Sequence, residues 1–159
     1  MDYVTIALSI HVLAVVLWIG GVAMVTTVLL PAMRRFKSAE ERIAFFETIE
    51  RRFAWQARGT TLLAGASGFY MMYRLNLWPE FLTIDNWWLG AMVLVWLLFT
   101  LMLFFIEPLF LDRWFEARAR RAPESTFALI QRFHWFLLAL SLVTIFGAVA
   151  GIHGLSFFH

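Results

Sequence analysis

One apolar stretch near the start of the chain, residues 3–31, constrains the fold more than any other feature. It reads YVTIALSIHVLAVVLWIGGVAMVTTVLLP and carries one ionisable group well inside it, the imidazole of His11. About 20 mostly apolar residues are enough for a helix to cross a bilayer. An imidazole at that depth needs partners for its polar nitrogens, so the stretch predicts a transmembrane helix with a functional histidine.

Apolar stretches of similar length recur along the rest of the chain. Hydrophobic residues make up 62% of the 159 residues and charged residues 15%, which is too apolar for one soluble core of this size. The second stretch is the most polar, and it qualifies because Arg58 lies near its start and can extend to the interface. We therefore expect a single all-α transmembrane domain over residues 1–159, an integral membrane antiparallel four-helix bundle. The expected spans are residues 4–30, 53–73, 87–106 and 133–155.

Basic residues are grouped in two of the three expected loops. The loops after the first and third spans are rich in arginine, whereas the loop after the second holds only Arg74. The positive-inside rule then places the first and third loops in the cytoplasm and both termini outside. Ser38 and Glu41 have capping-box spacing, which predicts a short interfacial helix in the first loop, and the third loop has a similar character. The sequence pI near 9.5 thus reflects membrane topology, not nucleic-acid binding.

The chain also carries a faint internal repeat. The sequence Arg-Phe-Ala-Trp at 52–55 opens the second span, and Arg-Phe-His-Trp at 132–135 opens the fourth. Pro31 and Pro108 are expected to end the first and third spans ahead of the basic loops. This pattern predicts two helical hairpins of similar plan.

Two histidines are expected at the same depth near the outer face. A helix rises about 1.5 Å per residue, so His11 lies about 30 Å from Pro31, and His153 lies about 31 Å from Arg132. Two imidazoles on antiparallel helices suit one metal, and in an apolar bundle without thiolates that metal is haem iron. Arg74, the only basic side chain expected on that side, is the candidate partner for a haem propionate.

Other side chains have more than one interpretation. His134 lies on the cytoplasmic side without a second histidine at its level, which favours an interfacial residue, with proton transfer or single axial ligation of a metal as alternatives. Glu107 and Arg58 are expected to pair near the cytoplasmic boundary. Glycines at 65, 68, 147 and 151 allow close packing of helices or of a flat cofactor. The chain has no cysteine, which excludes disulfides, thiolate metal sites and covalent haem attachment.

The run from His11 to Pro31 resembles the first membrane helix of small proteins related to the copper-resistance D (CopD) family. In that helix a histidine begins an H-x-x-A-x-x-x-W-x-G-G pattern and a proline ends it before basic residues. The matching positions here are His11, Ala14, Trp18, Gly20, Gly21 and Pro31. The run is more distantly similar to HemJ-type protoporphyrinogen oxidases. The resemblance implies a four-helix membrane protein of the haem b group, and it supports haem at His11 more than at His153.

The leading expectation is therefore a b-type cytochrome of the bacterial inner (cytoplasmic) membrane, which transfers electrons through haem b held by His11 and His153. Three alternatives stay open: a copper transport or resistance permease, a HemJ-like protoporphyrinogen oxidase, and a cofactor-free accessory membrane subunit. Copper is the alternative cofactor, since copper(I) accepts imidazole and thioether ligands. The expected partners are the lipid bilayer, a quinone or redox protein and further copies of the chain, with no role for nucleic acid.

Overall fold

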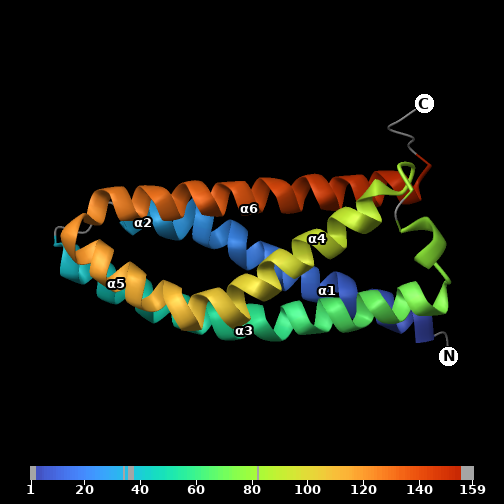
Figure 1. Cartoon of the computed structure of the whole chain (residues 1–159), viewed down its shortest axis with the longest axis horizontal. Coiled ribbons are helices and arrows are strands. Elements are labelled where there is room, and N and C mark those ends of the chain that lie inside the picture. The colour runs from blue at the N-terminus through green and yellow to red at the C-terminus, as the bar shows by residue number, and fades with distance from the viewer. Residues whose placement is uncertain (1–2, 34, 36–37, 82, 155–159) are drawn as a thin grey trace.

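The computed structural model describes residues 3–33, 35, 38–81 and 83–154. Within these ranges every regular element is a helix, which confirms the predicted all-α class. The start of α1 and the end of α6 lie at one end of the elongated molecule, and α5 and the start of α3 lie at the other (Figure 1). The elements are α1 (Tyr3–Met24), η1 (Val25–Leu29), α2 (Leu30–Met33), α3 (Ala39–Arg74), η2 (Trp78–Glu80), α4 (Trp87–Leu101), η3 (Met102–Leu111), α5 (Asp112–Arg121) and α6 (Pro123–Ile152).

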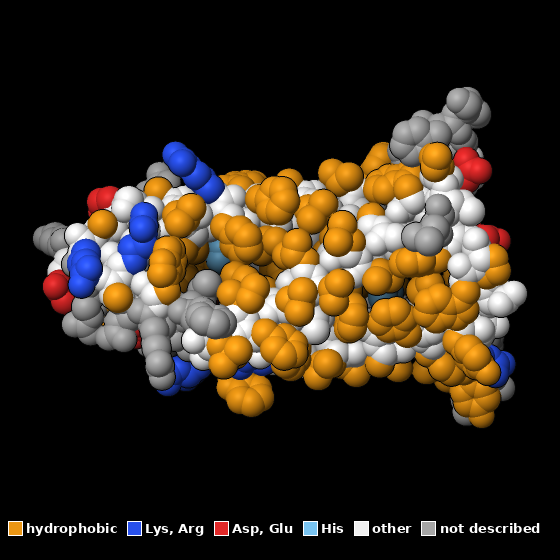
Figure 2. Space-filling model, viewed as in Figure 1, with side chains coloured by type: hydrophobic (Ala, Val, Ile, Leu, Met, Phe, Trp, Pro, Cys, Tyr) orange, Lys and Arg blue, Asp and Glu red, His pale blue; other side chains and the backbone are white. Residues whose placement is uncertain are grey.

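Within the described residues, three helical runs are long and apolar enough to cross a membrane: Tyr3–Met33, Trp87–Leu109 and Pro123–Ile152. Figure 2 shows hydrophobic side chains over the middle of one face, with charged side chains gathered towards the two ends. Exposed apolar residues around a helical bundle are what lipid contact requires. The structure therefore supports a membrane protein. The second expected span, residues 53–73, lies within α3, which is not one of these three runs.

The basic region before residue 53 does not form a separate interfacial helix, so that prediction was wrong. Residues 39–74 form one continuous helix of 36 residues, because no proline interrupts them. The predicted start is confirmed: the Ser38 hydroxyl accepts a hydrogen bond from the Glu41 amide at 3.0 Å. A helix of this length spans about 54 Å, more than the hydrocarbon core of about 30 Å. Its charged first half therefore extends beyond the apolar region.

Pro31 does not end the first helix, contrary to prediction. The helix passes through a π-helical segment, η1, and continues into α2, which contains Pro31. In a π-helix an amide donates to the carbonyl five residues earlier, so Pro31, which has no N–H, leaves the Thr26 carbonyl without its donor. Gln131 of α6 supplies the missing hydrogen bond, with its side-chain Nε2 2.7 Å from the Thr26 oxygen. A polar side chain from another helix thus stabilises the proline segment.

Pro108 is accommodated in the same way. It lies inside the π-helical segment η3, and the helix continues beyond it into α5. The carbonyl that Pro108 leaves without a donor is that of Leu103, and Nε of Arg58 donates to it at 3.0 Å. The same arrangement therefore occurs at both prolines. The proline leaves one helix carbonyl without its amide donor, and a side chain from another helix donates the hydrogen bond instead.

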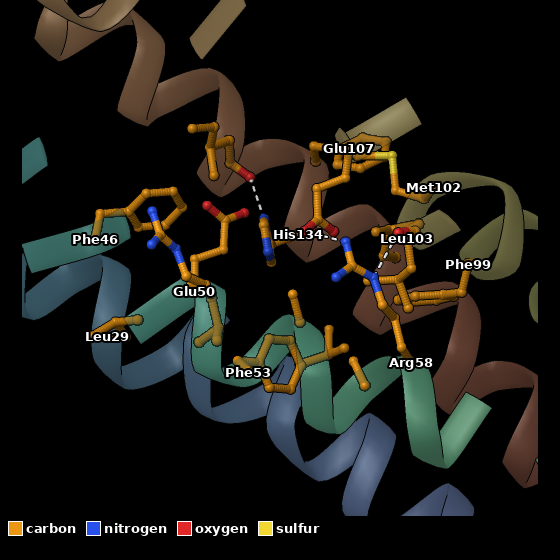
Figure 3. A pocket seen from close by; sticks show the side chains of 18 of the residues that line it. Leu29, Phe46, Glu50, Phe53, Arg58, Phe99, Met102, Leu103, Glu107 and His134 are labelled. Atoms are coloured by element: carbon orange, nitrogen blue, oxygen red, sulfur yellow. Dashed lines mark hydrogen bonds and ion pairs between the residues drawn. The ribbon is translucent and has the colours of Figure 1, made fainter. Parts of the chain in front are cut away.

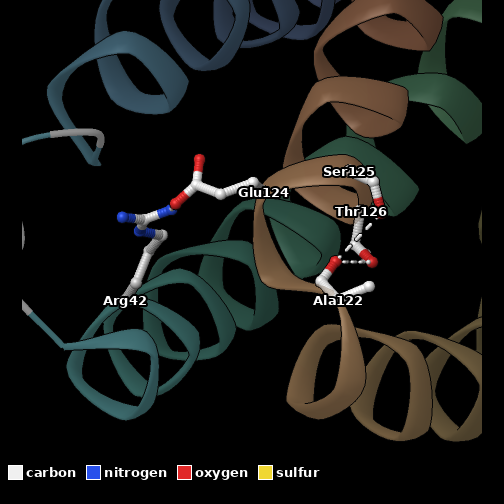
Figure 4. Close-up of polar contacts among 5 residues, drawn as sticks. All are labelled: Arg42, Ala122, Glu124, Ser125 and Thr126. Atoms are coloured by element: carbon white, nitrogen blue, oxygen red, sulfur yellow. Dashed lines mark hydrogen bonds and ion pairs between the residues drawn. The ribbon is translucent and has the colours of Figure 1, made fainter.

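Helix α6 begins at Pro123, ten residues before the expected fourth span, and proline is favoured at a first helical position. The Ala122 carbonyl accepts hydrogen bonds from the hydroxyls of Ser125 (3.2 Å) and Thr126 (2.9 Å). Beside this turn, Arg42 of α3 forms an ion pair with Glu124 at 2.7 Å (Figure 4). These contacts join the start of α6 to the first turns of α3, at the end of the molecule where α5 lies.

Close packing explains three of the four glycines that the sequence singled out. A Cβ at position 65 would overlap the Trp96 indole, and Cβ atoms at 147 and 151 would overlap Trp87 and Trp88. Trp96 is held in place, because its Nε1 donates to the Thr61 carbonyl at 2.9 Å. The glycines therefore seat bulky rings between helices.

Gly65→Ala is expected to lower the free energy of unfolding by about 1–3 kcal/mol, because the added methyl forces Trp96 away from its hydrogen bond. Gly59→Ala is the matched control on the same helix, since nothing lies within 4 Å of a Cβ there. That control should gain about 1 kcal/mol from higher helix propensity. Denaturant unfolding in detergent, followed by circular dichroism, measures both. Equal effects at the two positions would contradict the packing role of Gly65.

Candidate functional site

His11 lies where α1 packs against α3, and its ring is held by that helix. Its Nδ1 is 2.8 Å from the Ala64 carbonyl oxygen and 3.2 Å from the Ser67 hydroxyl. A carbonyl only accepts hydrogen bonds, so in the neutral ring Nδ1 carries the hydrogen. The Ser67 hydroxyl in turn donates to the Leu63 carbonyl at 2.6 Å. The lone pair of the neutral imidazole therefore resides on Nε2.

The face of α3 that receives the ring consists of small residues. Ala64, Ser67 and Gly68 follow the i, i+3, i+4 spacing that places side chains on one face of a helix. A Cβ at Gly68 would lie 3.2 Å from Cε1 of His11, closer than ordinary contact. Among the described residues, Nε2 of His11 has no hydrogen-bond partner. We did not predict from the sequence that this small-residue face would pack against His11, although the spacing of the small residues in the second apolar stretch indicates such a face.

His153 and Arg74 occupy the ends of their helices. His153 follows the last turn of α6, where its amide donates to the Val149 carbonyl at 3.3 Å, and its side chain is exposed. Arg74 is the last residue of α3 and is also exposed. In the described part of the chain, no contact joins His11 to either residue, and no group of three or more His, Cys, Asp or Glu side chains is placed to hold a metal ion.

A cavity of about 740 Å³ lies in the half of the molecule nearer α5 (Figure 3). Its walls come from α1, η1, α3, α4, η3, α5 and α6. Trp18, from the HxxAxxxWxGG pattern, forms part of the wall and packs edge-on against Phe99 with ring centroids 4.9 Å apart. The sequence analysis did not anticipate this cavity, because its walls combine helices that are distant along the chain.

His134 faces this cavity, with polar groups on both sides of it (Figure 3). Its Nδ1 donates to the Ile130 carbonyl at 3.0 Å, so the lone pair of the neutral ring is again on Nε2. In the described residues this Nε2 has no hydrogen-bond partner. Glu50 lies on one side of the ring and Glu107 on the other. Arg58 pairs with Glu107 at 3.1 Å, which confirms the ion pair expected from the sequence.

His11 and His134 therefore have the same hydrogen-bond arrangement, in two different parts of the molecule. Each donates through Nδ1 to a backbone carbonyl and keeps the Nε2 lone pair for another group, the arrangement that metal-bound histidines commonly show. Comparisons with protein-family models, curated proteins and solved structures gave no match. The surroundings of His11 and His134 are therefore the observations that bear on function.

Proposed function

We propose that the protein is a b-type cytochrome of the bacterial inner membrane, with haem iron ligated by His11. The observation that carries this proposal is the ring geometry of His11 within a helix apolar enough to span a membrane. An intramembrane imidazole whose Nδ1 is fixed by a carbonyl, and whose Nε2 has no hydrogen-bond partner among the described residues, has the form of an axial haem ligand. The absence of cysteine leaves histidine as the strongest available ligand for the iron.

His153 is the proposed second axial ligand, and Arg74 the proposed partner of a propionate. The start of α1 and the ends of α3 and α6 lie at the same end of the molecule, which supports this assignment (Figure 1). An exposed side chain at a helix end can reorient towards a ligand at little cost. In this proposal α3 is the fourth membrane-crossing helix, the termini lie outside, and the basic end faces the cytoplasm.

Bound haem would supply the one-electron chemistry, and the chain would control it. Ala64 and Ser67 orient the His11 ring, and the hydrogen bond to Nδ1 raises the donor strength of Nε2. Gly68 leaves room for that orientation. The apolar surroundings exclude water, which helps to set the reduction potential.

The test is a visible spectrum of the freshly purified protein in detergent, oxidised and then reduced with dithionite, with iron and copper quantified. The expected result is a Soret band, a sharp reduced α band and close to one haem per chain. Stoichiometric copper without a Soret band would replace the proposal with copper handling. Absence of both metals would reject the cytochrome and favour an accessory subunit. A haem protein that oxidises added protoporphyrinogen would instead indicate a HemJ-like oxidase.

A further inference from the structure

Polar groups of both charges line the cavity around His134. Its described lining contains three carboxylates, at Glu47, Glu50 and Glu107, and two guanidinium groups, at Arg51 and Arg58. Arg58 already donates to both Glu107 and the Leu103 carbonyl. The neutral His134 ring presents an acceptor at Nε2, which has no hydrogen-bond partner among the described residues. This acceptor suits a neutral ligand that donates a hydrogen bond.

Apolar side chains make up most of the cavity wall, and six of them are Trp or Phe. Phe53, Phe99 and Trp18 lie on the side of α3, α4 and α1, and other rings continue the wall towards α5 and α6. Aromatic rings bind a flat ring by stacking or edge contacts at centroid distances of roughly 4.5–7 Å. A volume of about 740 Å³ lies within the range for small-molecule pockets. The lining therefore favours a flat cyclic headgroup.

The mouth of the cavity is apolar on its α6 side. Leu129 is 46% exposed, Trp114 is 42% exposed and Phe133 is 36% exposed, whereas Arg51 of α3 is an exposed charged residue of the lining. Leu129 and Phe133 lie on α6, one of the runs apolar enough to span a membrane. A ligand with an apolar tail can leave that tail along these α6 residues. The α6 side of the mouth therefore suits an apolar tail.

We propose that this cavity binds the hydroquinone headgroup of a membrane quinol, with a quinol hydroxyl donating to Nε2 of His134. A hydroquinone is flat, neutral and a hydrogen-bond donor, and its natural forms carry an apolar tail. The inference deepens the proposed function by naming the class of electron donor, whereas binding of the headgroup itself does not require haem.

The test is calorimetric titration of the full-length protein in nanodiscs, under argon, with decyl-ubiquinol and separately with decyl-ubiquinone. His134→Ala should weaken hydroquinone binding about tenfold, the effect of losing one buried hydrogen bond. It should change quinone binding less than about twofold, because the quinone has no hydroxyl to donate. His134→Gln, whose side-chain carbonyl accepts a hydrogen bond, should recover part of the hydroquinone affinity.

Leu129→Trp should weaken binding of both forms by narrowing the mouth, and Leu142→Trp, at an exposed position on the same helix outside the cavity lining, is its control. His11→Ala should leave hydroquinone binding unchanged, so failure of the haem proposal and failure of this inference give different results. The inference is overturned if the wild type does not bind decyl-ubiquinol, if His134→Ala affects both forms equally, or if His134→Ala removes the haem.

Discussion

His11→Ala is expected to abolish haem binding, with Soret absorbance per chain falling to less than about a tenth of the wild-type value. The substitution removes the imidazole that the structure holds between α1 and α3 with its Nε2 available. Alanine cannot ligate iron, and no cysteine is present to replace the lost ligand. The measurement is the haem-to-protein ratio in detergent, together with circular dichroism to establish that the helices remain folded.

Two further histidine variants make this result specific. His134→Ala should keep its haem, because that ring faces the separate cavity near α5. If His153 is the second axial ligand, His153→Ala should lose the low-spin reduced spectrum. A retained spectrum would show that another group is the second ligand, and the assignment of His11 as the first ligand would be unaffected. Full haem content in a folded His11→Ala variant would refute ligation of the haem iron by His11.

Glu107→Ala is expected to lower the free energy of unfolding by about 3–5 kcal/mol, the usual cost of removing one partner from a buried ion pair. The two side chains are only 21% (Arg58) and 14% (Glu107) exposed, so solvent screening of their interaction is weak. Arg58→Ala should cost at least as much, because it also removes the donor to the Leu103 carbonyl beside Pro108. Denaturant unfolding in detergent measures these differences.

The double variant Arg58→Met/Glu107→Leu separates two contributions to stability. One comes from the ion pair, and the other from the hydrogen bond that Arg58 donates to the Leu103 carbonyl. Replacing both charges by apolar groups of similar size is often nearly neutral, so the double variant should be more stable than either single variant. It should remain about 1–3 kcal/mol below the wild type, because the Leu103 carbonyl then lacks its donor. Wild-type stability in the double variant would contradict that supporting role.

The Arg42–Glu124 pair is the control within the same chain (Figure 4). It is shorter, at 2.7 Å, and unequal in exposure, because the Arg42 side chain is 10% exposed and the Glu124 side chain is 80% exposed. Water can reach the Glu124 carboxylate, so Glu124→Ala should lower the free energy of unfolding less than Glu107→Ala does. An equal or larger effect of Glu124→Ala would contradict the role of carboxylate burial in these ion pairs.

The sequence alone was sufficient for the features that depend on local composition. Apolar runs predicted the helical class, and three of the four expected spans fall in helices apolar enough to cross a membrane, and the Ser38 and Glu41 spacing predicted a cap that the structure contains. The Arg58–Glu107 pair followed from matching depths on two helices. The four-helix membrane topology and the haem ligands remain predictions, because they depend on a bilayer and a cofactor as well as on the chain.

Tertiary structure decided what happens at the prolines and where the cavity lies. Proline normally ends a helix because it lacks an N–H, but Gln131 and Arg58 supply donors from distant helices, and the helices continue through Pro31 and Pro108. No local pattern reveals such a donor, since it comes from another part of the chain. A functional role for His11 was predicted from its own helix and remains a prediction, whereas only the packing of helices around His134 revealed the place of that ring in a ligand-sized cavity.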